Sequence, residues 1–391
     1  MGWLGNIFGS RRRREARLAI EAELRAALDE EGAASVWPQV IAALRSDPEA
    51  DGLYRLAGHA LRLGGEARTA VLFDRAADAP HDAQRLFELG SALLTNDEPE
   101  GAAIMLERAI AFVPFDAVVR SELALAHARS GDPDKVLATL ALHPCLADDP
   151  GALFELAWAS LLKGDVDTAE DAARELRGVG SLRNKLELAI DRAKASPNLR
   201  DARDFYFVEH GGVVLDSQGP LGGRYETLDV DSEWLSTVIT DAGAVLERLI
   251  PAPRRVIALD EEHWPLAEAL ATACGGSVLS PGRGRLPAAV LPLYEGRMIE
   301  TRVDAESRKA DELWFFALTV DHRRSLARAP ELVGAFTREA KREGESGKAT
   351  FKKARPCSAP LLDFVESRRP YLPPRGDRVR AAYLPDAPLP R

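Results

Sequence analysis

The stretch that decides the fold of the first half of the chain is Leu86–Pro114, LFELGSALLTNDEPEGAAIMLERAIAFVP. It contains two short helical patterns, separated by the turn-forming residues around Asp97. Leu89 and Gly90 lie in the first pattern and Leu106 lies in the second. A small residue such as Gly90 lets two helices approach closely, and a leucine beside it fills the groove between them. The stretch therefore predicts a helical hairpin.

The same pattern recurs with a spacing of 33 or 34 residues. Its four copies are aligned on Leu56, Leu89, Leu123 and Leu156, and a turn residue follows each of them at Gly64, Asp97, Gly131 and Gly164. A weaker copy precedes them, from Leu24 to Pro48. Because one hairpin cannot bury its apolar faces alone, several must stack. We therefore expect an all-α solenoid of about five helical hairpins over residues 17–182.

These repeats resemble the tetratricopeptide repeat family at the positions just given and at Ala109 and Pro114. Two features depart from that family, because the tryptophan of its first helix is absent and His143 stands where alanine is usual. The resemblance implies a concave groove that binds a peptide or helix of another protein. Aromatic and arginine side chains suit such a groove. The residues assigned to it are Tyr54, Arg62, Phe87, Arg129, Phe154 and Trp158. The alternative for the aromatic residues is packing between the repeats.

A change of pattern near Pro197 indicates a second domain. A polar helix within residues 183–198 is expected to cap the solenoid, and Pro197 breaks it. Beyond residue 199, short apolar runs alternate with helical patterns, which predicts a small α/β domain with a mainly parallel sheet over residues 199–342. Two short strands joined by a hairpin turn are expected at 205–217. Further strands are expected at 254–260, 276–280, 288–294 and 312–321, and helices at 233–249, 265–275 and 332–341. Residues 343–391 are rich in proline and arginine, and we expect an extended tail there.

Polar side chains follow three of the predicted strands. They are Asp260, Glu261, Glu262 and His263 after the first, Arg283 and Arg285 after the second, and Asp321 and His322 after the last. Ligands of open parallel sheets bind at the carboxyl ends of the strands. The carboxylate–histidine pairs and the Arg/Gly loop are therefore hypothesised to bind a metal ion or a phosphate group. Polar strand ends are also what any α/β domain places in solvent.

The run VIALDEEHWPLAEALATACGG, from Val256 to Gly276, resembles the acidic strand–loop–helix segment of phosphoribosyltransferases. That resemblance implies a substrate that carries a phosphate group. The Thr/Gly-rich phosphate loop of the family is replaced here by Glu261–Pro265, which argues against its catalytic activity.

The composition narrows the classes of partner. The net charge of −10 disfavours nucleic acid as a partner, and no apolar run is long enough to cross a bilayer. Three widely spaced cysteines favour a reducing, cytoplasmic location. No cofactor motif is found, and we expect no cofactor.

In the N-terminal extension, residues 1–16, apolar residues precede Arg11–Arg14. This segment either docks on the first helix or touches a membrane surface.

The sequence as a whole predicts an adaptor or scaffold that binds another protein through the groove of its solenoid. The alternative is an enzyme, or a degenerate relative of one, with its site at the strand ends.

Overall fold

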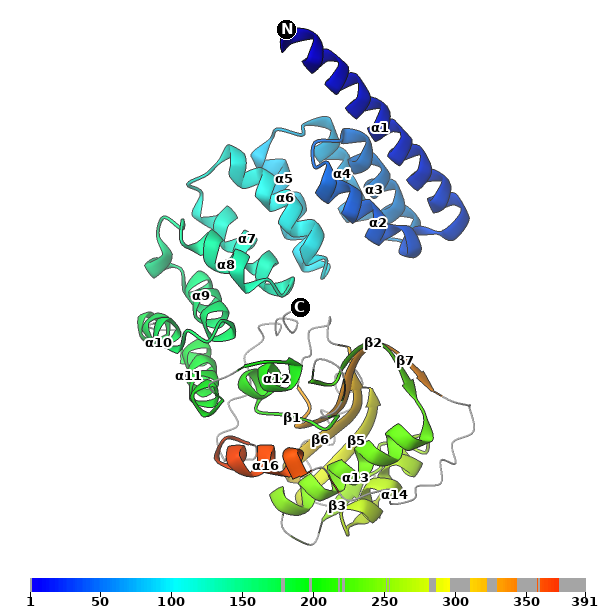
Figure 1. The fold of residues 1–391 in the computed structure, drawn as a ribbon, viewed down its shortest axis with the longest axis vertical. Coiled ribbons are helices and arrows are strands. Elements are labelled where there is room, and N and C mark those ends of the chain that lie inside the picture. Colours follow the sequence, from blue (N-terminus) through cyan, green and yellow to red (C-terminus); the bar gives the residue numbers. More distant parts are fainter. Residues whose placement is uncertain are drawn as a thin grey trace. The chain divides into compact units, whose positions relative to one another are not determined.

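A computed structural model of the chain describes residues 2–176, 180–196, 199–216, 219, 222–250, 252, 254–280, 286–295, 310–321, 329–342, 357 and 359–372. The chain divides into two compact units, residues 1–159 (unit 1) and 160–391 (unit 2). Helices form the first part, and helices around a parallel sheet form the second (Figure 1). The predicted fold class is therefore confirmed. The boundary predicted near Pro197 lies later than the division between the units, which falls inside a helix.

Unit 1 consists of helices joined by short turns. They are α1 Gly2–Glu31, α2 Ala33–Ser46, α3 Asp51–Leu63, α4 Ala67–Asp78, α5 Ala83–Thr95, α6 Pro99–Phe112, α7 Ala117–Arg129 and α8 Pro133–Leu140, followed by the short helix η1 Leu146–Asp148 and by α9, Pro150–Leu162, in which the unit ends. Helices α3 and α4, α5 and α6, and α7 and α8 pack as hairpins, and neighbouring hairpins pack in turn on each other (Figure 1). This is the stacked arrangement that the period of 33 or 34 residues predicts.

The turns within the hairpins use residues with left-handed backbone. Asp97 has φ of 60° and Gly131 has φ of 72°, both at the positions expected from the repeat. In the first copy the left-handed residue is Gly65, one position later than expected. The helices that open the next hairpins are capped by aspartates, because Asp82 and Asp116 accept hydrogen bonds from backbone N–H groups of α5 and α7.

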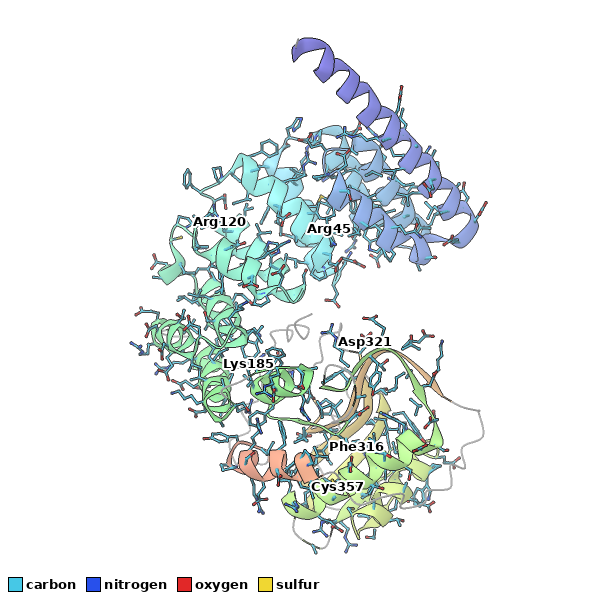
Figure 2. The ribbon with its side chains drawn as sticks, in the orientation of Figure 1. Arg45, Arg120, Lys185, Phe316, Asp321 and Cys357 are labelled. Carbon is cyan, nitrogen blue, oxygen red and sulfur yellow. The ribbon has the colours of Figure 1, made fainter. Side chains whose placement is uncertain are left out.

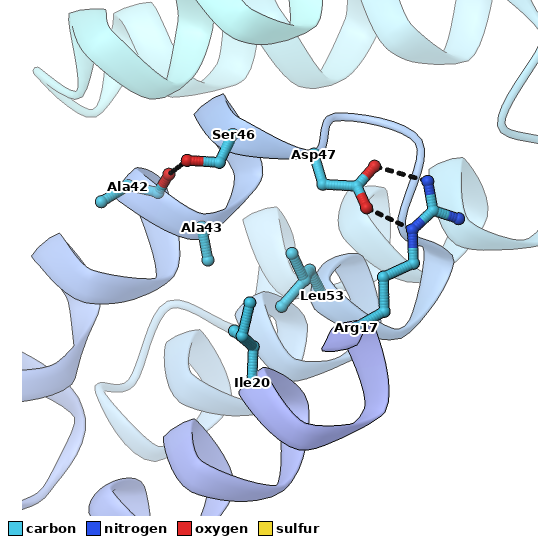
Figure 3. Close-up of a pocket in the computed structure, with 7 residues that line it drawn as sticks. All are labelled: Arg17, Ile20, Ala42, Ala43, Ser46, Asp47 and Leu53. Carbon is cyan, nitrogen blue, oxygen red and sulfur yellow. Dashed lines mark hydrogen bonds and ion pairs between the residues drawn. The ribbon is translucent and has the colours of Figure 1, made fainter. Parts of the chain in front are cut away.

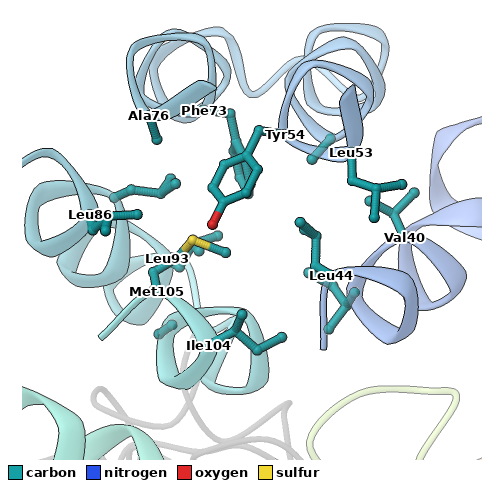
Figure 4. Packing of buried hydrophobic residues seen from close by; sticks show 14 of the residues in the cluster. Val40, Leu44, Leu53, Tyr54, Phe73, Ala76, Leu86, Leu93, Ile104 and Met105 are labelled. Atoms are coloured by element: carbon teal, nitrogen blue, oxygen red, sulfur yellow. The ribbon is translucent and has the colours of Figure 1, made fainter. Parts of the chain in front are cut away.

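The core of unit 1 depends on close approach of helices within a hairpin. A Cβ atom added to Gly90 of α5 would lie 2.7 Å from Cγ of Leu106 in α6, so any larger residue there would force a neighbour to shift. Around this crossing lie fully buried large side chains, among them Tyr54, Phe73 and Met105 (Figure 4). The sequence register that placed Gly90 and Leu106 at a helix crossing is therefore confirmed.

Unit 2 contains helices and a sheet whose described pairings are all parallel. Its helices are α10 Val166–Glu175, α11 Gly180–Ala195, α12 Ala202–His210, α13 Ser232–Leu249, α14 Trp264–Ala273, α16 Ala359–Arg368 and the short η4 Arg369–Tyr371. Its strands are β1 Val213–Val214, β2 Arg224–Val230, β3 Arg255–Ile257, β4 Ser277–Leu279, β5 Leu286–Glu295, β6 Ala310–Val320 and β7 Leu332–Arg342. Their order is β1-β7-β6-β5-β3-β4, and β2 pairs with β7 beyond the end of β1.

Helices cover the centre of this sheet. All residues from Leu313 to Val320 of β6 are buried, as in a parallel sheet with both faces covered (Figure 2 labels Phe316 among them). Helix α12 packs through Tyr206, whose ring centroid lies 5.1 Å from that of Phe336 in β7. Helix α13 comes close to the same strand, because a Cβ atom on Gly334 would lie 3.0 Å from a methyl carbon of Val238.

The strand hairpin predicted at 205–217 is wrong, although its second strand is present as β1, Val213–Val214, which pairs with β7. Residues 202–210 form helix α12, which is capped by Asp201 at its start and by Gly211 at its end. The Asp201 side chain accepts hydrogen bonds from the N–H groups of Arg203 and Asp204, and Gly211 has the left-handed φ of 69° that often ends a helix. The aromatic run in the sequence favours a strand, but these two caps and the burial of the segment against β7 stabilise a helix.

The helix predicted at 332–341 is also wrong, because these residues form β7. Leu332–Thr337 are buried without interruption, as in a strand covered on both faces, whereas Glu339 and Lys341 are exposed. The helix was predicted because the apolar residues at the start of this segment are followed by charged ones, a pattern that an amphipathic helix can also show.

The extended tail predicted for residues 343–391 is corrected in part, because residues 359–371 are helical. Phe364 of α16 packs on Phe207 of α12 with ring centroids 5.9 Å apart. The Arg368 guanidinium lies 3.9 Å from the Phe364 ring centroid, donates a hydrogen bond of 2.7 Å to Ser196 Oγ and lies 3.8 Å from an Asp204 carboxylate oxygen. Helix α16 is therefore part of the folded unit 2.

Candidate functional site

The residues assigned to the groove do not form one exposed surface. Tyr54, Phe154 and Trp158 are buried, with 0%, 7% and 4% of their surface exposed, so they pack between helices. Phe87 and Arg129 are half-buried. The remaining residue, Arg62, is exposed and forms an ion pair with Asp74 of the neighbouring helix. Tyr54, Phe154 and Trp158 therefore pack between the helices, as the alternative for the aromatic residues predicts. These three side chains cannot line an open groove.

A different part of unit 1 exposes large apolar side chains. It comprises residues at three successive turns between hairpins, and we call it the inter-repeat edge: His81, Phe112, Phe115, Val118 and Leu142. Phe115 has 82% of its surface exposed, Leu142 65% and Val118 60%. The repeat pattern did not single out these residues. The apolar run around a proline, AFVPFDAVV at 111–119, is the sequence signal that could have found them.

Two contacts link these turns to their neighbours. The rings of His81 and Phe112 meet edge to face, with centroids 5.8 Å apart. Ser121, one helical turn beyond Val118, contacts Nε2 of His143 at 3.0 Å, and His143 directly follows Leu142. The first turns of α7 therefore lie close to the turn after α8.

The network at the turn after α8 is structural in character. Ser121 Oγ donates a hydrogen bond of 2.5 Å to Asp149, and His143 Nδ1 accepts one of 3.3 Å from the N–H of Cys145. Because Nδ1 is an acceptor in this geometry, the neutral His143 ring carries its proton on Nε2 and donates it to Ser121. Histidine in this tautomer cannot remove a proton from Ser121, so the three side chains do not form a nucleophilic triad. Burial raises the pKa of Asp149, but hydrogen bonds from Ser121 and Ala152 outweigh it and hold the pKa below its usual value.

Buried arginines fix the same turns from inside. Arg108 donates hydrogen bonds to the carbonyl oxygens of Pro48 and Pro80, at 2.5 and 2.6 Å, and also contacts the Tyr54 hydroxyl. Arg120, labelled in Figure 2, donates to the Pro114 carbonyl oxygen from two nitrogens, at 2.6 and 3.0 Å. The backbone directly before His81 and Phe115 is therefore held in place, and the inter-repeat edge is preformed.

The charge around the inter-repeat edge is negative. Apart from histidines, every ionisable side chain in turns 79–82, 113–116 and 141–149 is a carboxylate or the Cys145 thiol. Residues 51–159 hold 9 Lys and Arg against 17 Asp and Glu, and Arg108 and Arg120 are buried. A basic partner is therefore favoured electrostatically at this surface.

A small pocket lies at the start of the solenoid, between α1, α2 and α3 (Figure 3). Its volume is about 230 Å³, and Ile20, Ala43 and Leu53 form most of its apolar wall. The Arg17–Asp47 ion pair borders it. This volume suits one apolar side chain better than a whole ligand, because small-molecule pockets usually measure about 300–1,000 Å³.

At the strand ends, the structure brings together two of the predicted residues. His263 Nδ1 lies 2.7 Å from Asp260 Oδ1, and the His263 side chain has no exposed surface. Glu261 and Glu262 are exposed, and Asp321 is half-buried at the end of β6 (Figure 2). Arg283, Arg285 and His322 lie outside the described residues, so their predicted convergence with His263 stays a prediction.

The second ring nitrogen of His263 is the unusual feature of this region. Nε2 is buried and has no hydrogen-bond partner among the described residues. Leaving a buried polar atom unpaired costs about 1–3 kcal/mol, and such atoms are few in native proteins. The nearest described ring is that of Tyr294, near the end of β5, with centroids 5.1 Å apart.

Comparison with models of known protein families and with curated protein sequences finds no match for this chain. Within the described residues, no cluster of three or more His, Cys, Asp or Glu side chains is arranged to hold a metal ion. No helix in that part of the chain has both the length and the apolar character required to span a bilayer. The function is therefore argued from a local geometry, that of the inter-repeat edge.

Proposed function

We propose that this protein is an adaptor whose helical unit 1 binds another protein through the inter-repeat edge. The partner that fits is a segment with apolar side chains and basic residues. The observation that carries the proposal is the exposure of Phe115, 82%, together with that of Phe112, Val118 and Leu142 at the same and the following turn. Contiguous exposed apolar side chains with a polar surround are typical of protein-binding surfaces.

Two further properties support this proposal. The hydrogen bonds from Arg108 and Arg120 to turn carbonyl groups hold the edge in one conformation, which lowers the entropy lost on binding. The carboxylates of Asp116 and Asp148 are exposed beside the apolar residues, so lysine or arginine side chains of a partner would find opposite charges there. The proposal retains protein binding by the repeats but assigns it to the turns, because three of the expected groove residues are buried.

The test begins with a photoreactive amino acid placed at position 115, and separately at position 63, in the full-length chain. Leu63 is an apolar residue of unit 1 with 58% exposure that lies outside the inter-repeat edge. The protein that crosslinks at 115 and not at 63 is then purified, and its affinity is measured by titration calorimetry. Phe115→Ser should weaken binding about 30-fold, since a buried aromatic anchor contributes about 2 kcal/mol. Leu63→Ser should leave the affinity unchanged, and added salt should weaken binding.

Three outcomes contradict the proposal. The first is that Phe115→Ser and Leu63→Ser change the affinity equally. The second is that the crosslinked partner binds more tightly at high salt, which excludes charge complementarity. The third is that the wild-type chain dimerises in sedimentation experiments and Phe115→Ser alone makes it monomeric. In that case a second copy of the chain covers the edge.

A further inference from the structure

Helix α1 is much longer than the two helices on which it packs. It has 30 residues, whereas α2 has 14 and α3 has 13. Arg17 of α1 forms an ion pair with Asp47, the residue directly after α2, so the end of α2 is level with Arg17. Residues 2–16 therefore continue past the end of α2 by about 22 Å, at about 1.5 Å per residue (Figure 1).

Helix α3 does not cover residues 2–16 either. Gly52, in the first turn of α3, lies against Glu21, because a Cβ atom added to Gly52 would overlap the Glu21 carboxylate. The start of α3 is therefore near the level of Glu21, and its other end lies at the start of α2, where Gly64 approaches Ala33. The N-terminal extension belongs to the first helix and cannot dock on it, which removes one of the two roles expected from the sequence.

The sides of α1 are identified by residues of known burial. Leu24 and Leu28 have 6% and 2% of their surface exposed, and they mark the side that packs on α2 and α3. Leu18 has 55% of its surface exposed and marks a different side. Leu4 and Ile7 precede Leu18 by about four and about three helical turns, so their positions share the side of Leu18. The helix register therefore places Leu4 and Ile7 away from the side that packs in unit 1.

The sequence of the N-terminal extension changes from apolar to basic. Residues 1–10 contain no charged side chain, and their large apolar residues after Met1 are Trp3, Leu4, Ile7 and Phe8. Arg11–Arg14 follow, and these four positions surround the helix axis because successive residues of a helix are about 100° apart. They are the only charged side chains in residues 1–14, so the remaining chain carries a net charge of −14. The extension thus combines an apolar end with a ring of positive charge.

This order of residues matches the surface of a bilayer that contains anionic lipids. Apolar side chains at the end of the helix can enter the acyl region, and arginines one or two turns further on reach the lipid phosphates. A nucleic acid would use the arginines but not the apolar residues, and the acidic remainder of the chain would repel it. Residues 1–10 are too few to cross a bilayer, which takes about 20, so the contact is confined to one surface.

We propose that the N-terminal extension binds the surface of a membrane that contains anionic lipids. Trp3, Leu4, Ile7 and Phe8 enter the lipid, and Arg11–Arg14 contact the headgroup phosphates. The extension continues a helix of unit 1, so the membrane contact localises the repeats without covering the inter-repeat edge. The inference is therefore independent of the protein-binding function proposed for unit 1.

The experiment is flotation of the full-length chain with vesicles. The chain should float with vesicles of phosphatidylcholine and phosphatidylglycerol, but not with vesicles of phosphatidylcholine alone, and added salt should weaken the binding. Leu4→Ser/Ile7→Ser should lower the apparent affinity for the anionic vesicles at least tenfold. Leu63→Ser/Val71→Ser is the matched control, because these apolar residues of unit 1 have 58% and 45% of their surface exposed. It should float like the wild type.

A second pair of variants tests the arginines at equal net charge. Arg12→Gln/Arg13→Gln should lower the affinity for anionic vesicles at least tenfold, since each arginine near such a surface contributes to binding. Arg68→Gln/Arg75→Gln changes the net charge by the same amount at exposed positions of α4 and should have little effect. The urea midpoint of all four variants should equal that of the wild type.

Four outcomes would overturn the proposal. The first is equal flotation with neutral and anionic vesicles, or none with either. The second is an equal loss of binding in a variant and its matched control. The third is a lowered urea midpoint of Leu4→Ser/Ile7→Ser, which would show that the extension packs on unit 1. The fourth is binding of single-stranded RNA that Arg12→Gln/Arg13→Gln abolishes and Leu4→Ser/Ile7→Ser retains, without flotation.

Discussion

The helix crossing at Gly90 allows the repeat architecture to be tested with a single methyl group. In Gly90→Ala the new Cβ would lie 2.7 Å from Cγ and 2.9 Å from Cδ2 of Leu106, a fully buried side chain of α6. Both distances are shorter than a normal carbon–carbon contact of about 3.5–4.0 Å. Either Leu106 changes its rotamer within a filled core, or α5 and α6 move apart.

The expected magnitude is the sum of two opposing effects. Replacing glycine by alanine inside a helix stabilises it by about 0.5–1 kcal/mol. Overpacking a close-packed interior costs about 1–3 kcal/mol. We therefore expect Gly90→Ala to lower the free energy of unfolding by about 1 kcal/mol, and Gly90→Leu to lower it by more, because three further carbon atoms must be placed at the crossing.

Gly52→Ala is the matched control for this substitution. Gly52 lies in the first turn of helix α3, and its added methyl group would meet only the end of the flexible Glu21 side chain, which can move into solvent. Urea unfolding followed by circular dichroism should show Gly52→Ala unchanged or stabilised by up to about 1 kcal/mol. The control therefore separates the helix-propensity gain from the effect of the crossing.

A double-mutant cycle with Leu106→Ala tests the contact itself. Leu106→Ala alone should destabilise by about 2–5 kcal/mol, because it leaves a cavity. The methyl group added by Gly90→Ala then has space, so the double variant should be more stable than the sum of the single effects by about 0.5–3 kcal/mol. Strict additivity, or a Gly90→Ala variant as stable as Gly52→Ala, would refute the helix crossing and with it the repeat register.

Two further predictions concern other parts of the chain. Asp149 has a lowered pKa in the folded chain, so its contribution to stability is present above its unfolded value near 3.8 and is lost as the pH falls through the lowered pKa. The stability difference between wild type and Ser121→Ala, measured in urea, should therefore shrink as the pH is lowered below about 4, and a constant difference would contradict this. Arg368→Gln removes the charge next to buried Asp204 and should release α16, seen as faster amide exchange in residues 359–368, whereas the exposed Arg369→Gln should not.

The repeat part of the fold could be predicted because its determinants are local. Gly90, Asp97 and Gly131 each have a role that depends on residues within one hairpin. Segment 202–210 and strand β7 could not be assigned correctly from pattern alone. Their secondary structure is decided by burial, because Tyr206 packs on Phe336 of a strand that is itself covered on both faces. The caps of α12, Asp201 and Gly211, were nevertheless present in the sequence as local signals.

The candidate sites could be predicted only in part, for a similar reason. The Asp260–His263 contact spans three residues and follows from a turn, so sequence could place both in one site. Tyr294, by contrast, reaches His263 only through the register of β3 and β5. Whether an aromatic residue of a repeat is buried, as Tyr54 is, or exposed, as Phe115 is, depends on the next hairpin.

The connectivity of the edge strands has a consequence for synthesis on the ribosome. Strands β1 and β2 both pair with β7, so Val214 must wait for Val333, 119 residues later in the chain. Helix α16, which packs on α12, emerges later still. The hairpins of unit 1 pack mainly on their sequence neighbours and can form as they leave the exit tunnel. Between the synthesis of β1 and that of β7, the nascent α/β unit exposes unpaired strand edges. Its folding should therefore depend on chaperones more than the folding of the repeats does.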